Sequence, residues 1–125
     1  NMSQVHQIYR CKHCGNIVEV VKFGGGTLVC CGENMEQVDE NTTDAAVEKH
    51  VPVVERDGTT LNVSVGSTLH PMADEHFIEW IEVIAGDEVQ RRQLKPGEEP
   101  RAAFTVPGDS FTVRAYCNLH GLWKA

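Results

Sequence analysis

The chain has 125 residues, 41% of them hydrophobic, and a formal net charge of −7. This length allows one domain of ordinary size or a small domain beside a larger one, and the negative charge argues against general nucleic-acid binding, which needs a basic face. No apolar run approaches the roughly 18 residues of a membrane span, and no basic segment followed by an apolar stretch predicts a signal peptide, so we expect a cytoplasmic location.

The first segment, residues 1–37, has few large apolar side chains and a run of three glycines at 24–26. So small a unit cannot bury enough surface to fold unaided, and we expect a bound metal to hold it together. The acidic, polar stretch 38–46 follows, and we interpret it as a linker. Residues 47–125 are then expected to form a second domain.

The second domain has the pattern of short β-strands. The predicted strands cover residues 51–55, 61–65, 76–84 and 111–117. The turn sequences between them are Asp57-Gly58, Lys95-Pro96-Gly97 and Val106-Pro107-Gly108-Asp109. Residues 76–84 are apolar on both faces except at Glu79 and Glu82, as in a central strand, and 111–117 is expected to be the final strand. Short strands separated by such turns predict a mainly β protein with a β-sandwich.

Four of the five cysteines, Cys11, Cys14, Cys30 and Cys31, fall within 21 residues. An odd number of cysteines argues against a disulfide scaffold. The spacing Cys-x-x-Cys-Gly lets two thiolates bind one metal, and the second pair completes a tetrahedral site for zinc or iron. Zinc ribbons usually use Cys-x-x-Cys for both pairs, so the adjacent second pair favours a distorted site. His6 and His13 are interpreted as solvated residues outside it.

The remaining cysteine and four of the six histidines form a second pattern. These residues are His50, His70, His76, Cys117 and His120. Each lies near a predicted turn or strand boundary, and turns at one end of a sandwich converge in space. Imidazoles suit iron, copper, zinc and nickel, and a thiolate adds softness. The sequence therefore predicts a second metal site of different character.

Three segments around these residues resemble the signature segments of superoxide reductases. They are Glu48-Lys49-His50-Val51-Pro52, His70-Pro71-Met72 with His76, and Cys117-Asn118-Leu119-His120-Gly121-Leu122-Trp123-Lys124. The four-cysteine unit resembles desulforedoxin. Together, over nearly the whole chain, they resemble the desulfoferrodoxin family, the two-iron class of superoxide reductases.

The resemblance implies an immunoglobulin-like sandwich and two iron ions per chain. The first iron would be rubredoxin-like, bound by Cys11, Cys14, Cys30 and Cys31. The second would have His50, His70, His76 and His120 in a plane and Cys117 as the axial ligand. The implied activity is one-electron reduction of superoxide to hydrogen peroxide without oxygen evolution. Rubredoxin or a comparable reductase would supply electrons, and the family is often homodimeric.

Two further residues are candidates for the reaction itself. Superoxide is an anion and the chain is net negative, so a local positive charge must offset the long-range field, and Lys49 beside His50 is the natural group. Glu48 resembles the family glutamate that occupies the sixth position of oxidised iron. We also expect the backbone N–H groups of Asn118 and Leu119 to hydrogen-bond the Cys117 sulfur.

Two other functions fit part of the pattern. A β-sandwich with an upstream histidine and a late Cys-x-x-His also suits a blue-copper electron carrier, but that site needs two histidines, a cysteine and a weak axial methionine. No methionine follows His120, and His70 and His76 would have no role. A zinc-stapled interaction module explains the four cysteines but not the second set.

Overall fold

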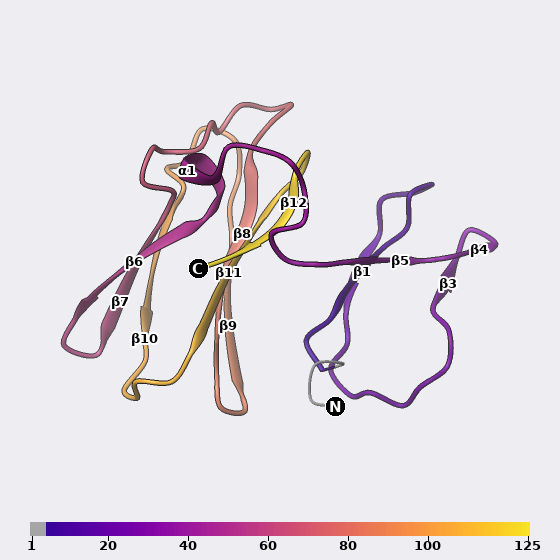
Figure 1. Cartoon of the computed structure of the whole chain (residues 1–125), viewed down its shortest axis with the longest axis horizontal. Coiled ribbons are helices and arrows are strands. Elements are labelled where there is room, and N and C mark those ends of the chain that lie inside the picture. Colours follow the sequence, from indigo (N-terminus) through magenta and orange to yellow (C-terminus); the bar gives the residue numbers. More distant parts are fainter. Residues whose placement is uncertain (1–4) are drawn as a thin grey trace. The chain divides into compact units, whose positions relative to one another are not determined.

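A computed structural model describes residues 5–125, and the chain divides after Asp39 into two units. The first unit contains five very short strands. They are β1 (Ile8–Arg10), β2 (Ile17–Glu19), β3 (Val29–Cys30), β4 (Glu33–Asn34) and β5 (Glu36–Val38). β1 lies between β2 and β5 in an antiparallel sheet, and β3 pairs with β4 in a separate hairpin (Figure 1).

Apolar packing in the first unit is sparse. Among its described residues only Ile8 and Cys11 are buried apolar side chains, each 2% exposed. Larger apolar side chains such as Val21 and Phe23 are 82% and 51% exposed. The predicted lack of a conventional core is therefore observed in the described part of this unit.

The second unit is a sandwich of two antiparallel sheets. Its strands are β6 (Pro52–Asp57), β7 (Thr60–Val65), β8 (Ile78–Ala85), β9 (Glu88–Gln93), β10 (Arg101–Thr105), β11 (Thr112–Cys117) and β12 (Gly121–Lys124). One sheet has the order β10-β7-β6 and the other β12-β11-β8-β9 (Figure 1). The mainly β prediction is confirmed, but β11 is not the final strand, because β12 follows it and pairs with it.

The core lies between the two sheets and follows the alternation of the sequence. In β7 the side chains of Leu61, Val63 and Val65 are at most 1% exposed, and Ile81 and Val83 of β8 are equally buried. The predicted hairpin is present, since β6 pairs with β7 from Asp57↔Thr60 to Pro52↔Val65. Alternating apolar residues thus build the inner faces, as a half-buried strand requires.

Glu82, which interrupts the apolar pattern of β8, is fully buried. Its carboxylate accepts hydrogen bonds from Nε of Arg114 on β11, at 2.7 Å, and from Nε of Arg91 on β9, at 3.0 Å. Arg114 also donates to Glu40, at 3.3 Å. Because a buried carboxylate is costly unless it is paired, the two arginines explain how a central strand accommodates this residue.

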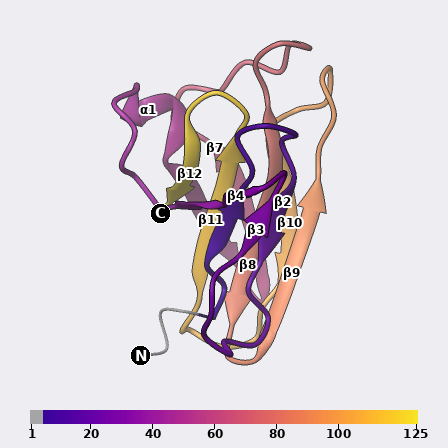
Figure 2. The ribbon, with the colours of Figure 1, turned by 90° about the vertical axis from the view of Figure 1, so that its right-hand side faces the viewer.

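One end of the sandwich gathers three connections. They are α1 (Val47–His50), the loop between β7 and β8, and the β11–β12 turn, all at the upper end of the second unit in Figures 1 and 2. Gly66 allows the loop to approach α1 closely, because a Cβ there would lie 2.7 Å from the Glu48 carbonyl oxygen. The one-turn helix was not predicted from the sequence. No helix within residues 5–125 has the length and apolar character needed to cross a membrane.

Candidate metal centres

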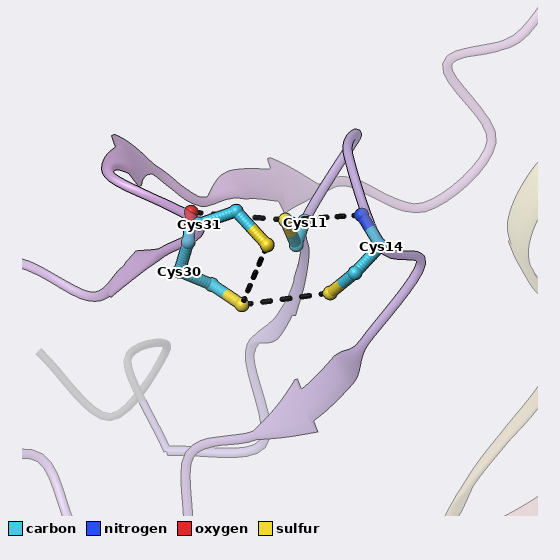
Figure 3. A group of neighbouring side chains, drawn as sticks. All are labelled: Cys11, Cys14, Cys30 and Cys31. Atoms are coloured by element: carbon cyan, nitrogen blue, oxygen red, sulfur yellow. Dashed lines mark hydrogen bonds between the residues drawn. The ribbon is translucent and has the colours of Figure 1, made fainter.

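The four cysteines of the first unit gather at the ends of two hairpins (Figure 3). Their sulfurs lie within 4.8 Å of one another, with Cys14 and Cys30 at 3.6 Å and Cys30 and Cys31 at 4.0 Å. A tetrahedral site with metal–sulfur bonds of about 2.3 Å separates its sulfurs by about 3.8 Å. The described geometry therefore fits one metal ion held by four thiolates.

The adjacent cysteines reach the same site because the backbone turns between them. Cys30 ends β3, whereas Cys31 (φ 54°) and Gly32 (φ 75°) form the two-residue connection to β4. Two central residues with positive φ define the hairpin turn that usually requires Asn, Asp or Gly. Cys31 thus adopts a conformation unfavourable for a side-chain-bearing residue, and this turn lets both adjacent cysteines reach the site.

The thiols of this group differ in acidity. Hydrogen bonding from the backbone N–H of Cys14 lowers the pKa of Cys11 to about 6. Hydrogen bonds with the sulfurs of Cys14 and Cys11 raise the pKa of Cys31 to about 12. The pKa of Cys30 is also raised, chiefly by Cys14. Binding a metal here must therefore release protons, because thiolates are the ligands.

His13 and His6 lie outside the four-cysteine group. Nε2 of His13 is 2.5 Å from one carboxylate oxygen of Glu33. The other oxygen of that carboxylate is 2.9 Å from Nζ of Lys12. Nδ1 of His6 is 3.6 Å from Glu19. The interpretation of both histidines as residues outside the site agrees with these contacts.

The second group lies at the gathered end of the sandwich. Ligand atoms of His50, His76, Cys117 and His120 lie within 4.8 Å of one another. His50 ends α1, Cys117 ends β11, and His120 lies in the turn before β12. His76 closes a tight turn with Ala73 just before β8. Four of the five residues predicted for this site thus form one group.

His70 lies outside that group of atoms but beside its rings. Ring-centroid distances are 4.7 Å from His50 to His70, 4.6 Å from His70 to His76, 5.2 Å from His76 to His120 and 4.9 Å from His120 to His50. The diagonal from His50 to His76 is 6.5 Å, and neighbouring rings are nearly perpendicular. The four imidazoles therefore occupy the corners of an approximate square.

Backbone carbonyls orient two of these rings. Nδ1–H of His50 donates to the carbonyl of Ala46, and Nδ1–H of His70 to that of Pro71, each at 2.7 Å. Each Nε2 is thereby left without a proton, the arrangement usual for metal-binding histidines, and Nε2 of His50 lies 3.1 Å from Nδ1 of His120. Nε2 of His70 and of His76 is buried with no hydrogen-bond partner in the described part of the chain. Such atoms are costly unless something binds them, and a metal ion fits this requirement.

Burial also sets the protonation of this group. It is the main reason that the pKa of His70 falls to about 4 and that the pKa values of His50 and His76 are lowered. Burial raises the pKa of Cys117, and hydrogen bonds from the N–H groups of Leu119 and His120 act against it. Neutral imidazoles can bind a metal directly, whereas the thiol must lose its proton.

One predicted contact of the sulfur is wrong. The backbone N–H of Asn118 donates to the carbonyl of Phe77, at 3.2 Å, so the N–H groups that serve Cys117 are those of Leu119 and His120. The reason is the tight Cys117–His120 turn, which directs the later N–H groups back at the sulfur. Sequence reasoning also gave no role to Trp123, whose Nε1–H donates to the His120 carbonyl at 3.0 Å.

Glu48 and Lys49 lie in α1 with exposed side chains, directly before His50. The Glu48 carbonyl accepts a hydrogen bond from the Thr68 N–H at 2.9 Å, which joins α1 to the loop that carries His70. Lys49 is close enough to His76 for its charge to contribute to the lowered pKa of that ring, after burial and His120. The negative charge of Glu75 acts on the pKa of the same ring in the opposite direction, so charges of both signs lie near His76.

Comparisons with known proteins agree with both centres. The family described as "Desulfoferrodoxin" matches residues 42–125, and "Desulfoferrodoxin, N-terminal domain" matches residues 3–38. The chain belongs to the desulfoferrodoxin family. It is 57% identical to a desulfoferrodoxin homolog of Archaeoglobus fulgidus, over 99% of each chain. It is 52% identical to the desulfoferrodoxin of Nitratidesulfovibrio vulgaris, over 99% of this chain and 98% of that relative.

Solved structures give the same assignment. The superoxide reductase from Treponema pallidum superposes with a TM-score of 0.75 at 32% identity, covering 94% of this chain and 98% of that one. The one-iron superoxide reductase from Giardia intestinalis gives a TM-score of 0.56 at 33% identity, over 62% of this chain and 95% of that one. The chain is thus an enzyme of the superoxide reductase family.

Proposed function

We propose that this chain reduces superoxide to hydrogen peroxide at an iron ion in the second unit. The observation that carries the proposal is the square of four imidazoles beside the buried thiol of Cys117. Iron bound there would supply one electron to superoxide. With two protons, superoxide then becomes hydrogen peroxide, and no dioxygen forms. Imidazole and thiolate together are a suitable donor set for this metal.

In this proposal the side chains divide the work of holding the iron. His50, His70, His76 and His120 would hold the iron through their imidazoles, and Cys117 would supply the thiolate ligand. The carbonyls of Ala46 and Pro71 keep two rings in the tautomer that offers Nε2. The N–H groups of Leu119 and His120 would draw negative charge from the Cys117 sulfur, a device by which proteins tune bound metals.

Glu48 and Lys49, the two residues before His50, have separate proposed roles in the reaction. Lys49 offsets the net charge of −7 locally and so favours the approach of anionic superoxide. Glu48 is proposed to bind the oxidised resting iron and to take no part in the first encounter. Both roles are supported by the position of the two residues directly before His50.

The first unit is proposed to hold a second iron, with Cys11, Cys14, Cys30 and Cys31 as ligands. Four thiolates leave no position for substrate, so this iron is structural or an electron relay. Rubredoxin or a rubredoxin-like reductase is the proposed electron donor. We retain the domain limits 1–37 and 47–125, with a linker over 38–46, as part of this proposal.

A homodimer is proposed from the surface of the first unit. A hollow of about 640 Å³ is lined in part by Val18, Val21, Phe23, Leu28 and Val29. These side chains are between 38% and 82% exposed, which is unusual for a cluster of large apolar residues. We propose that a second copy covers them, and analytical ultracentrifugation of the full chain tests this.

The alternative, a blue-copper-like electron carrier, is disfavoured by the surroundings of the site. Such a carrier needs an axial methionine, but the sulfur of Met72 accepts a hydrogen bond from the Ile78 N–H at 3.4 Å and packs against the core. A zinc-stapled binding module would leave the buried Nε2 atoms of His70 and His76 unexplained.

The deciding experiment is an assay of superoxide consumption by the iron-loaded chain. We expect one hydrogen peroxide for each superoxide consumed and no dioxygen, with two irons per chain by metal analysis. Dioxygen evolution would indicate a dismutase instead. A copper content of one per chain would support the electron carrier.

A further inference from the structure

Asn118 lies between two of the proposed ligands, Cys117 and His120, but it binds the loop that carries a third. Its Oδ1 accepts a hydrogen bond from the Phe77 N–H at 3.0 Å, and its Nδ2 donates to the Glu75 carbonyl at 3.1 Å. Its own backbone N–H donates to the Phe77 carbonyl at 3.2 Å. One residue therefore holds the backbone on both sides of His76.

The sheet alone does not hold this loop in place. Pairing between β8 and β11 is shifted by an irregularity between Tyr116 and Cys117, so that Cys117 pairs with Ile78, and β8 begins there. His76 lies two residues before the strand. The three hydrogen bonds of Asn118 therefore extend the contact between β11 and the segment before β8 beyond Cys117↔Ile78, the last pair of the sheet.

The turn that contains His76 is closed by its own hydrogen bonds. The N–H of Ala73 donates to the His76 carbonyl at 3.0 Å, and the N–H of His76 donates to the Ala73 carbonyl at 3.1 Å. These bonds fix the shape of the turn but not its position relative to Cys117. Nε2 of His76 is buried without a hydrogen-bond partner in the described chain, so no hydrogen bond at this atom fixes the ring.

We propose that Asn118 is a positioning residue, which sets the place of His76 relative to Cys117 and so the affinity and symmetry of the second metal centre. The inference rests on the proposed function, because it takes His76 and Cys117 as ligands. Neither Asn118 nor its hydrogen bonds touch the substrate. Residues that orient metal ligands typically change metal affinity by about 10- to 100-fold when they are replaced.

The test is a chelator challenge of the iron-loaded full chain. We expect Asn118→Ala to lose the second iron at about 10- to 100-fold lower chelator concentration than the parent. The electron paramagnetic resonance signal of that iron should also change in symmetry. The four-cysteine iron of the same molecule is the internal reference and should be retained equally by both proteins.

Two further variants separate positioning from general stability. Asn118→Asp keeps the acceptor for Phe77 but loses the donor to Glu75, so its chelator midpoint should lie between those of the parent and Asn118→Ala. Asn41→Gly is the matched control. Asn41 (φ 56°) also makes two side-chain hydrogen bonds, to the carbonyl and N–H of Lys124, and glycine tolerates its backbone conformation.

The outcomes are distinct. An unchanged midpoint and unchanged resonance signal in Asn118→Ala would overturn the inference, and so would an equal loss of iron in Asn41→Gly. If Asn118→Ala does not fold, Asn118→Asp decides alone by the same two readouts. A parent protein without iron at the second site would instead contradict the proposed function.

Discussion

The two metal centres of this protein differ in how much buried apolar structure supports them. In the first unit the cysteines sit on short hairpins with almost no buried apolar side chains, so the structure has little besides a metal to hold it. In the second unit the histidines lie at one end of a sandwich whose apolar core already contains Cys117 and twelve other buried residues. We therefore expect a metal to be a condition of folding in the first unit and an addition to a folded sandwich in the second.

Removing the metals should give the largest effect and should separate the units. We expect the first unit to lose its ordered structure entirely, because Ile8 and Cys11 are the only apolar side chains buried within its described residues. The second unit should stay folded. Amide spectra of the metal-free chain would check this, with Trp80 and Trp123 fluorescence as a reporter of the second unit alone. A first unit that stays ordered without metal would break the comparison.

Cys117→Ser should abolish peroxide formation and the thiolate-to-iron absorption band. Oxygen is a poorer donor to iron than sulfur at this buried position, and the sandwich should remain folded.

Cys14→Ser is the corresponding experiment on the other centre, since it should alter the first centre and leave the reaction of the second iron with superoxide nearly intact. Rapid-mixing spectroscopy of both variants measures this. Loss of that reaction in Cys14→Ser, with the second iron still bound, would show that the centres are not independent.

Ile81→Ala should lower the free energy of unfolding of the second unit by about 2–5 kcal/mol, as expected for truncating a large buried side chain. Ile81 is fully buried between the sheets. Denaturant unfolding followed by tryptophan fluorescence gives the value, because both tryptophans lie in the second unit. Val21→Ala in the exposed part of the first unit is the control, and an equal loss there would contradict the picture of a single apolar core.

Lys49→Ala should slow the encounter with superoxide about tenfold. Two unit charges about 6 Å apart interact by roughly 3 kcal/mol at an effective dielectric constant near 20, and exposure and salt reduce this to about half. Lys49→Arg should keep most of the rate, because the proposed role is charge. Pulse radiolysis at several salt concentrations would test it, and the parent should be slowed by salt more than Lys49→Ala. Equal rates at low salt would make Lys49 an ordinary surface residue.

Glu48→Ala should have the smallest kinetic effect. The ferric spectrum of the second centre should shift, because the proposed carboxylate ligand is lost, while the rate of superoxide binding should stay similar, because Glu48 is proposed to take no part in the first encounter. Glu48→Gln is the matched variant that keeps the volume. An unchanged ferric spectrum in both variants would count against ligation by this residue.

The elements predicted from the sequence are those whose signal is local. Alternation at Leu61, Val63 and Val65 predicted β7, and Asp57-Gly58 predicted the hairpin before it, because both patterns depend on neighbouring residues. The gathering of the four cysteines was likewise predicted from their spacing. The ligand roles of individual residues remain predictions.

What the sequence did not reveal depends on contacts between distant segments. The helical turn α1 is held by its contacts with the loop at Gly66 and Thr68. The helix propensity of residues 47–50 alone therefore did not predict it. The pairing of Glu82 with two arginines requires knowledge of the sheet register. The prediction that the Asn118 N–H bonds the Cys117 sulfur was wrong for the same reason. The register shift between Tyr116 and Cys117 directs that N–H to the carbonyl of Phe77.

All five proposed ligands of the second centre enter from one end of the sandwich, and the β8–β9 turn at Gly86 lies at the other (Figure 1). Gly86 itself has a positive φ of 61°, at which a side chain would be strained, but its neighbour Asp87 is exposed in the same turn. A surface thiol, a dye or an electrode tether attached at Asp87 would be separated from the iron by the whole length of the strands. The protein therefore offers a handle for immobilisation that leaves the reactive end facing the solution, as a superoxide sensor would require.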